Sequence, residues 1–261
     1  MRFAILVGLT VAACSPGSVG GGGGGGSGSD GGGGEGGGTD ASVEELASFS
    51  FFVTSIEKMR ELSGSQDGFG GDLGGLDGAD GICQDIAASV GFGAKQWRAF
   101  LSVAVGPEGV PVHAIDRIGE GPWYDRNGRL VADDIDGLLA GDRPAGDPQI
   151  ASDLPNERGE GQMQFGDTHD VMTGTSALGQ LDGESPDATC QDWTSAVGPG
   201  SEGQVRAGHS WPAESGQSWI EAHPLRGCAP GVDLEQNGAG SGDCVGCSGG
   251  YGAIYCFALT P

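Results

Sequence analysis

Basic side chains are scarce in this chain. Its 261 residues include only 12 Lys and Arg against 36 Asp and Glu, which gives a formal net charge of −24. Lys58 and Lys95 are the two lysines, and no cluster of basic residues occurs. Proteins that bind nucleic acid, heparin-like polyanions or anionic lipid use grouped Lys and Arg. We therefore expect none of these partners.

The chain also lacks an apolar run long enough to span a membrane. Its N-terminal apolar stretch, residues 3–11, is well short of the ~20 residues that a spanning helix needs. A basic start, a short apolar stretch and small residues at 12–13 are typical of a secretory signal peptide. Because Cys14 follows directly, the segment resembles the lipobox of bacterial lipoproteins.

This resemblance implies that residues 1–13 are removed and that Cys14 carries lipid. Each buried CH₂ contributes roughly 0.8 kcal/mol, and two or more acyl chains anchor a protein stably. Ser15, which follows the cysteine, favours the outer membrane over retention in the inner one. We therefore predict a protein anchored by lipid at the bacterial outer membrane and cell surface. An ordinary signal peptide followed by an unmodified cysteine is the alternative.

Two regions of different composition follow Cys14. Residues 14–48 are dominated by glycine, with an unbroken run at 20–26. Such a segment buries no apolar surface and predicts a flexible tether with a reach of roughly 30 Å. Residues 49–261 contain all five Trp and all three Tyr, and they are numerous enough to bury one core. We expect a single domain there.

The remaining cysteines are even in number. Seven cysteines minus Cys14 leave six, which in an exported chain predict three disulfides. Six cysteines allow fifteen pairings, and their spacing does not choose among them. Cys244 and Cys247 have the CxxC spacing of redox and zinc sites. Gly and Ser surround them and no second pair lies nearby, so a local disulfide is favoured.

Short strands separated by loops dominate the predicted secondary structure. Apolar residues at helical spacing predict one helix that begins near Asp77, with Asp77 as its N-cap, and ends at Gly91–Gly93. Asn127-Gly128 predicts a hairpin turn. Residues 133–168 read as long surface loops. The expected strands are 50–54, 97–103, 122–125, 129–132 and 253–259.

Several segments, in order, resemble one bacterial family. They are Phe51–Ser55, Gly71–Asp80 with Cys83, Trp97–Ala99, Asp116–Gly119, Gly121–Tyr124, His169–Val171, Thr189–Ser195, Gly208–Ser210, Trp219 with Cys228, and Tyr255–Phe257. The family is the endostatin-like, C-type-lectin-like lipoproteins of bacterial surfaces, best known from spirochaetes.

The resemblance implies an α+β, C-type-lectin-like fold. Its first and last strands would pair antiparallel, and one helix would follow the first strand. It also implies disulfides between Cys83 and Cys256 and between Cys190 and Cys228. Cys244 and Cys247 lie in an insertion that departs from the family pattern, and we pair them with each other.

Metal binding is not expected from the spacing of the histidines. His169-Asp170, His209 and His223 are far apart in sequence and lack the i, i+4 spacing of helical metal pairs. We therefore predict that they do not converge and that no metal is bound. Calcium held by loop carboxylates is the one cofactor left open, with solvated acidic loops favoured instead. The candidate carboxylates are Asp72, Asp77, Asp133, Asp134 and Asp153.

Four residues are candidate ligand contacts. Trp211, in a polar loop after His209, is expected to be exposed, whereas the other tryptophans are expected in the core. Asn156 and Glu157 lie in the segment nearest to the sugar-binding loop of C-type lectins. That loop offers calcium a Glu side chain where this chain has Leu154, so lectin-type sugar binding is not expected.

These features predict a non-catalytic binding module presented at the cell surface for adhesion to an extracellular protein or glycan. A lipid anchor, a tether and a disulfide-stabilised domain serve presentation. Two alternatives remain: a metal-dependent hydrolase with clustered histidines, and a structural envelope lipoprotein.

Overall fold

A computed structural model describes residues 47–197, 205–235 and 242–259. The predicted signal peptide, Cys14 and the tether up to residue 46 lie outside the described residues. The described part is α+β, with short helices and small sheets. Among these residues no helix is both long and apolar enough to cross a membrane.

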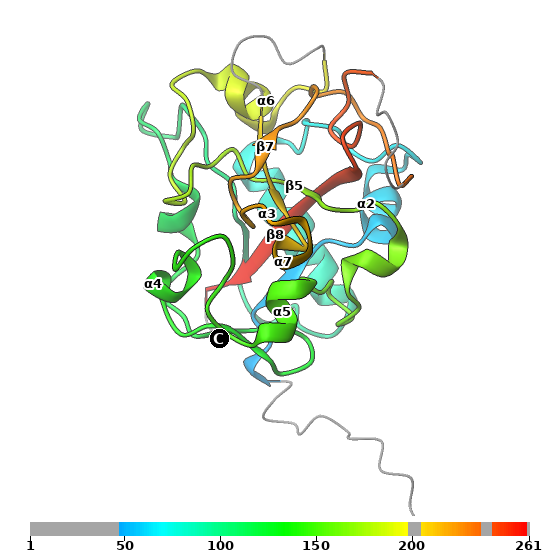
Figure 1. Ribbon diagram of the computed structural model, residues 1–261. Helices are drawn as coiled ribbons and strands as arrows, with labels where there is room; N and C mark the ends of the chain where they lie inside the picture. The colour runs from blue at the N-terminus through cyan, green and yellow to red at the C-terminus, as the bar shows by residue number, and fades with distance from the viewer. Residues whose placement is uncertain (1–46, 198–204, 236–241, 260–261) are drawn as a thin grey trace, which may run out of the picture. The chain divides into compact units, whose positions relative to one another are not determined.

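The long C-terminal strand β8 (Gly250–Ala258) organises the described domain. All nine of its residues are buried, and Figure 1 shows it in red through the middle of the domain. It pairs antiparallel with β1 (Phe51–Val53), so the predicted pairing of the first and last strands is confirmed. β8 begins three residues before the predicted position.

Both edges of β8 are occupied. β1 pairs with residues 255–257 on one edge, and β2 (Trp97–Ala99) pairs antiparallel with residues 256–258 on the other. β5 (Asp170–Met172) pairs parallel with the preceding part of β8 on the β2 edge. β2 is therefore shorter than the predicted strand 97–103, because β5 takes the next stretch of that edge.

Beyond β5 the sheet continues outward. β5 pairs antiparallel with β6 (Arg206–His209), and β6 pairs antiparallel with β7 (His223–Pro224). The strand order is β1-β8-β5-β6-β7, with β2 also on β8. A separate hairpin, β3 (Trp123–Tyr124) with β4 (Leu130–Ala132), confirms the turn predicted at Asn127-Gly128.

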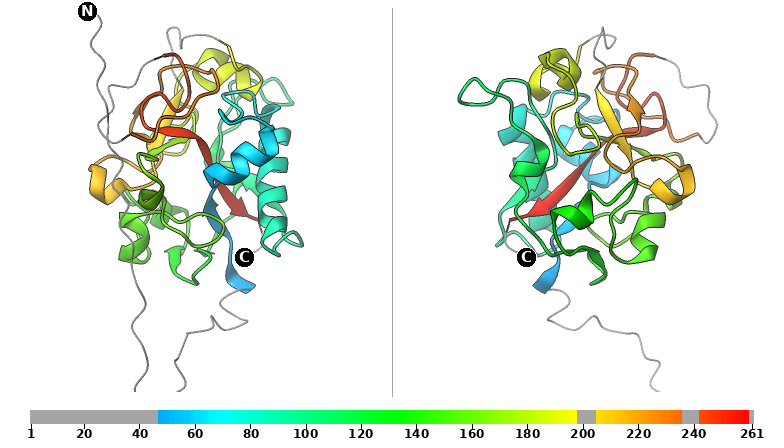
Figure 2. Two further views of the ribbon diagram at one scale, coloured as in Figure 1. Left: turned by 90° about the vertical axis from the view of Figure 1, so that its right-hand side faces the viewer. Right: turned by 60° about the vertical axis from the view of Figure 1, so that its left-hand side comes forward.

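Two helices cover one side of β8 (Figure 2). α3 (Gly75–Ser89) is the predicted helix, but its N-cap is Gly74, three residues before the predicted N-cap Asp77. Gly74 has a φ of 78°, which only glycine adopts easily, so the chain can enter the helix sooner. α2 (Ile56–Ser63) was not predicted from the residue pattern. The side chain of Ser55 caps it by accepting from the Lys58 backbone N–H.

The region 133–168 is not the run of surface loops that its composition predicts. It contains α4 (Ile135–Leu138), α5 (Pro148–Ser152) and a 3₁₀ turn at Gln162–Phe165. Asp134 and Asp147 cap the two helices, so acidic residues that read as loop-forming act here as N-caps. Leu138, Ile150 and Leu154 are buried.

The remaining short elements lie in the segments that connect the strands. They are 3₁₀ turns at Ala114–Arg117 and Pro186–Thr189, α6 (Cys190–Trp193) and α7 (Pro212–Ser215). α6 is not an ordinary helix, because all four of its residues have positive φ between 51° and 65°.

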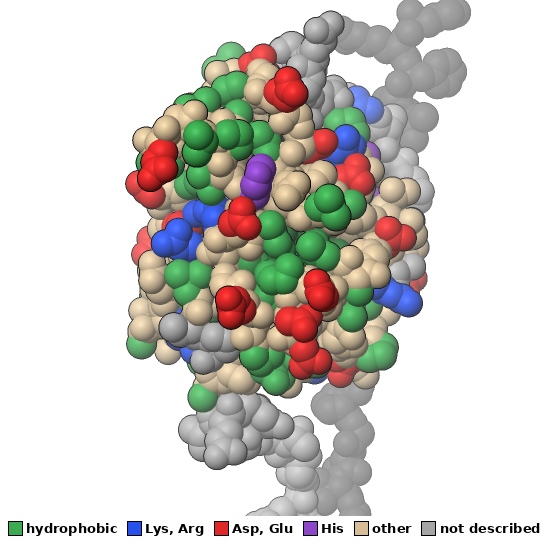
Figure 3. Space-filling model, turned by 90° about the vertical axis from the view of Figure 1, so that its left-hand side faces the viewer, with side chains coloured by type: hydrophobic (Ala, Val, Ile, Leu, Met, Phe, Trp, Pro, Cys, Tyr) green, Lys and Arg blue, Asp and Glu red, His purple; other side chains and the backbone are tan. Residues whose placement is uncertain are grey.

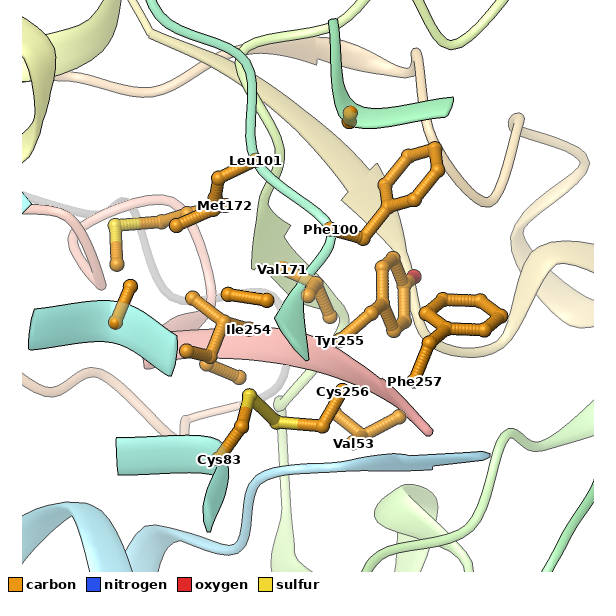
Figure 4. Packing of buried hydrophobic residues seen from close by; sticks show 14 of the residues in the cluster. Val53, Cys83, Phe100, Leu101, Val171, Met172, Ile254, Tyr255, Cys256 and Phe257 are labelled. Carbon is orange, nitrogen blue, oxygen red and sulfur yellow. A yellow bond between two sulfur atoms is a disulfide. The ribbon is translucent and has the colours of Figure 1, made fainter. Parts of the chain in front are cut away.

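Aromatic side chains and one disulfide hold the core together. Cys83 on α3 is bonded to Cys256 on β8, and Figure 4 shows this bridge among the buried side chains of the sheet. Cys190–Cys228 and Cys244–Cys247 are the other disulfides, so all three predicted pairs are present. The four tryptophans expected in the core are buried there: Trp97, Trp123, Trp193 and Trp219.

Candidate metal centre

Strand ends of the sheet bring together His169, Asp170, His209 and His223. Asp170 begins β5, His209 ends β6 and His223 begins β7. One potential ligand atom from each residue lies within 4.8 Å of all the others. In the described ranges this is the one group of three or more His, Cys, Asp or Glu side chains close enough to share an ion.

The register of the strands explains why three of these residues meet. Asp170 lies directly opposite His209 in the β5–β6 pair, and directly opposed side chains are on the same face of a sheet. His223 lies opposite Ala207, which is two residues from His209 and so on the same face. The three side chains therefore project from neighbouring positions on one face.

His169 joins them from outside the strand. In a regular strand it would point to the face opposite Asp170, but β5 begins only at Asp170. A register shift falls between Asp170 and Val171 in the pairing with β8, and such bulges re-aim neighbouring side chains. Gly249 leaves room for the result, because a Cβ at that position would overlap the His169 ring.

The distances from Asp170 to the three imidazoles are close to the edge length of a tetrahedral metal site. The Nε2 atoms of His223, His169 and His209 lie 3.1, 3.4 and 3.7 Å from Oδ1 of Asp170. Metal–ligand bonds of 2.0–2.1 Å in a tetrahedron give edges of about 3.4 Å. The separations from Asp170 are therefore of the size that one shared ion requires, and all four ligand atoms lie within 4.8 Å of one another.

Two of the imidazoles have their second nitrogen engaged elsewhere. Nδ1 of His169 lies 2.5 Å from Oδ1 of Asp167, and Nδ1 of His223 lies 3.2 Å from the backbone oxygen of Pro224. With the proton on Nδ1, each ring donates to that oxygen and turns the lone pair of Nε2 toward Asp170. Metal-bound histidines usually have such a partner behind them. Asp167 was not singled out from the sequence.

Buried polar atoms in this group lack hydrogen-bond partners. Asp170 is 1% exposed, and among the described residues neither of its carboxylate oxygens has a hydrogen bond of acceptable geometry. Both ring nitrogens of His209 are buried and unpartnered in the same way. Each unsatisfied buried polar group costs about 1–3 kcal/mol, and a charged one costs more. His223 comes nearest to Asp170, at 3.1 Å, and the Asp170 carboxylate and the His209 ring remain the unsatisfied groups.

The pKa values of two of these histidines are shifted in opposite directions. Burial, together with the neighbouring His169 and His223, lowers the pKa of His209 to about 3, so its ring is neutral at pH 7. The contact with the Asp170 carboxylate raises the pKa of His223, and burial opposes that rise. A divalent cation would balance the two carboxylates, Asp170 and Asp167, that lie against the imidazoles.

The predictions for the histidines and for Trp211 require correction. The expectation that His169, His209 and His223 do not converge is wrong, because residues far apart in sequence meet through the strand order β5-β6-β7. Trp211, expected to be exposed, is 9% exposed. Its ring packs edge-on against His169, 5.5 Å between centroids, and thus shields the group.

Asn156 and Glu157 are not surface ligand contacts either. Both are fully buried. The side-chain oxygen of Asn156 accepts from the backbone N–H groups of Arg158 and Glu160 and closes a turn. The carboxylate of Glu157 accepts from the backbone N–H and the hydroxyl of Ser55. Glu157 therefore joins the loop after α5 to the start of α2.

The acidic residues considered for calcium do not form a common site in the described part of the chain. Asp134 caps α4, and Asp153 accepts from the backbone N–H groups of Gln162 and Met163. Asp72 accepts from the backbone N–H of Gly74. These three carboxylates therefore stabilise the local backbone.

Comparison with protein-family models and with curated proteins finds no match for this chain.

Proposed function

We propose that this protein is a metal-binding module of the cell exterior, which holds one divalent transition-metal ion between His169, Asp170, His209 and His223. The observation that carries the proposal is the convergence of four buried or half-buried ligand residues, two of which, Asp170 and His209, have no hydrogen-bond partner in the described ranges. A shared cation satisfies all four at once.

The donor set favours zinc. Three imidazole nitrogens and one carboxylate oxygen at tetrahedral spacing are a common zinc environment. Calcium takes six to eight oxygen ligands, so three nitrogens argue against it at this place. Copper(II) binds nitrogen-rich sites more tightly than zinc and is the natural competitor.

Four protein ligands support a holding role over a hydrolytic one. Catalytic zinc sites typically have three protein ligands and leave the fourth position to water or substrate. Here Asp170 supplies a fourth donor from the centre of the group. The ion would cross-link β5, β6 and β7. It would also tie together the two ends of the segment 210–222, which lies between His209 and His223. We therefore propose a non-enzymatic protein.

Display at the outer membrane and cell surface remains part of the proposal. It is supported by the lipobox-like segment that ends at Cys14 and by the glycine-rich residues 14–48. The finer assignment of the fold as C-type-lectin-like is proposed on three features that the described domain contains. They are the antiparallel β1–β8 pair, the helix after β1 and the Cys83–Cys256 bridge.

Metal titration of the purified full chain tests the metal centre. After removal of metal by chelation, wild-type protein is expected to take up one zinc ion per chain, measured by calorimetry and elemental analysis. His223→Ala removes a ligand whose side chain is 33% exposed, so the fold should tolerate it. We expect this variant to bind zinc at least 100-fold more weakly. Asp167→Ala should weaken zinc binding by about 10–100-fold, because the Asp167 carboxylate orients the His169 ring.

His113→Ala is the matched control. His113 is the one histidine of the sequence outside the group around Asp170. Its Nδ1 accepts from the backbone N–H of Leu181. This variant should bind zinc like wild type. Wild-type protein without stoichiometric zinc uptake, or equal affinity in His223→Ala and His113→Ala, would contradict the proposal.

A further inference from the structure

Two adjoining hollows lie outside the metal centre. The first has a volume of about 820 Å³ and the second about 610 Å³. Asp116 and Gly119 line both hollows, which therefore adjoin at these residues, and together we call them the Asp116 groove. None of its lining residues belongs to the group around Asp170.

The groove has an aliphatic lining. The apolar residues of the first hollow are Leu76, Val103, Val105, Pro107, Val112 and Leu259, and those of the second are Ile115, Ile135, Leu139 and Leu178. Val105 and Leu178 are 56% and 63% exposed, which is unusual for large aliphatic side chains. Contiguous exposed apolar surface of this kind marks interaction sites.

The charge of the lining is acidic. Five carboxylates face two guanidinium groups, a net of −3 (5 acidic, 2 basic): Asp77, Asp80, Asp116, Asp192 and Glu120 against Arg98 and Arg117.

Part of this charge is already used inside the protein. Arg117 donates two hydrogen bonds of 2.8 Å to Asp80, and Asp192 accepts from the backbone N–H groups of Ala104 and Val105.

The unused charges set the preference of the groove. The carboxylates of Asp77, Asp116 and Glu120 are exposed and have no hydrogen bond or ion pair to any residue in the described ranges. Arg98 is the one unpaired cation in the lining and is only half exposed. The three free carboxylates therefore outweigh it, and the chain as a whole carries a net charge of −24.

The surface view in Figure 3 presents the side of the domain that carries α4. Ile135 of α4 lines the second hollow. On that face hydrophobic side chains gather in broad areas, and acidic side chains lie next to them (Figure 3). An apolar centre with charge of one sign beside it is a surface that selects a partner by complementarity.

We propose that the Asp116 groove binds a segment of a partner protein in which Lys or Arg residues accompany aliphatic side chains. The aliphatic lining would bury the apolar side chains, while Asp77, Asp116 and Glu120 pair with the basic ones. No aromatic ring, against which a sugar ring could stack, is among the lining residues. The groove therefore favours a peptide over a glycan.

Selection from a random peptide library tests this directly. Twelve-residue peptides displayed on phage are selected on the full-length wild-type protein, and bound sequences are counted. We expect enrichment of Lys and Arg together with Leu, Ile or Val. The best peptide, synthesised, should lose at least tenfold in affinity when Asp116→Asn and Glu120→Gln are combined, and its binding should weaken at high salt.

A matched double variant controls for a general change of charge. Asp67→Asn with Glu184→Gln removes the same two charges from exposed positions outside the groove. This protein should bind the peptide like wild type. Selected peptides without basic residues, or equal binding by the two double variants, would overturn the proposal. Peptide binding is also measured on zinc-free protein. Unchanged binding there would show that the groove acts independently of the metal centre.

Discussion

At the scale of single residues, Asp170 matters most to the proposed metal centre. Its carboxylate is buried and faces three imidazole nitrogens within 3.7 Å. A buried carboxylate without a hydrogen bond is costly unless a cation accompanies it. His209, neutral and equally unpartnered, adds to that need.

Glu157 gives a prediction for the pH dependence of stability. Burial raises its pKa, while the hydrogen bond from the Ser55 hydroxyl opposes the rise. A carboxyl with a raised pKa in the folded state contributes stability below its unfolded pKa of about 4.5. That contribution is lost as the pH rises through the folded pKa. Glu157→Gln removes this loss and keeps an acceptor for Ser55.

The free energy of unfolding in urea, compared at pH 4 and pH 7, checks this expectation. Relative to wild type, the free energy of unfolding of Glu157→Gln should be higher at pH 7 than it is at pH 4. The change is about 1.4 kcal/mol for each unit by which the pKa is raised. Glu184→Gln, at an exposed position, is the control. A difference that stays constant, or that favours wild type at pH 7, would show that burial does not dominate at Glu157.

Single-residue exposure was the hardest property to predict. Trp211 lies in a polar stretch and Asn156 and Glu157 in an acidic one, so local composition indicated surface positions. Trp211 is buried against His169, and Glu157 is buried against Ser55, 102 residues earlier in the chain. Contacts over such separations leave no local pattern.

At the scale of elements, the sequence predicted helices and strands well where a single buried face or a single turn determines the element. The periodicity of α3, the Asn127-Gly128 hairpin and the apolar strands β1 and β8 were all predicted. Errors arose where elements compete. β2 stops at Ala99 because β5 occupies the same edge of β8, and no property of residues 100–103 announces that.

The disulfides make a prediction at this scale. In the chain-entropy model, stabilisation grows with the length of the closed loop. Cys83–Cys256 spans 173 residues and Cys190–Cys228 spans 38. Replacing both cysteines of the first bridge by Ala should therefore lower the free energy of unfolding by about 5 kcal/mol, against about 4 kcal/mol for the second.

Urea unfolding of the two double variants under oxidising conditions measures the order. A larger loss from the shorter bridge would show that strain or contacts, rather than loop closure, determine the contribution of these bonds.

At the scale of the whole molecule, the candidate site depends on topology. The ligands His169, His209 and His223 are 40 and 14 residues apart in sequence and meet only because β5, β6 and β7 are consecutive in the sheet. The sequence shows each histidine but neither the strand order nor the register. The even set of cysteines, in contrast, needs no register to be interpreted, and the three disulfides that it predicts are present.

X-ray absorption at the zinc edge of the reloaded protein tests the metal centre most directly. The account predicts one zinc per chain with four nearest neighbours at about 2.0–2.1 Å, all nitrogen or oxygen, and the outer-shell scattering of three imidazole rings. His223→Ala should lower the imidazole count to two. A spectrum with six or more oxygen neighbours, or with sulfur in the first shell, would contradict it.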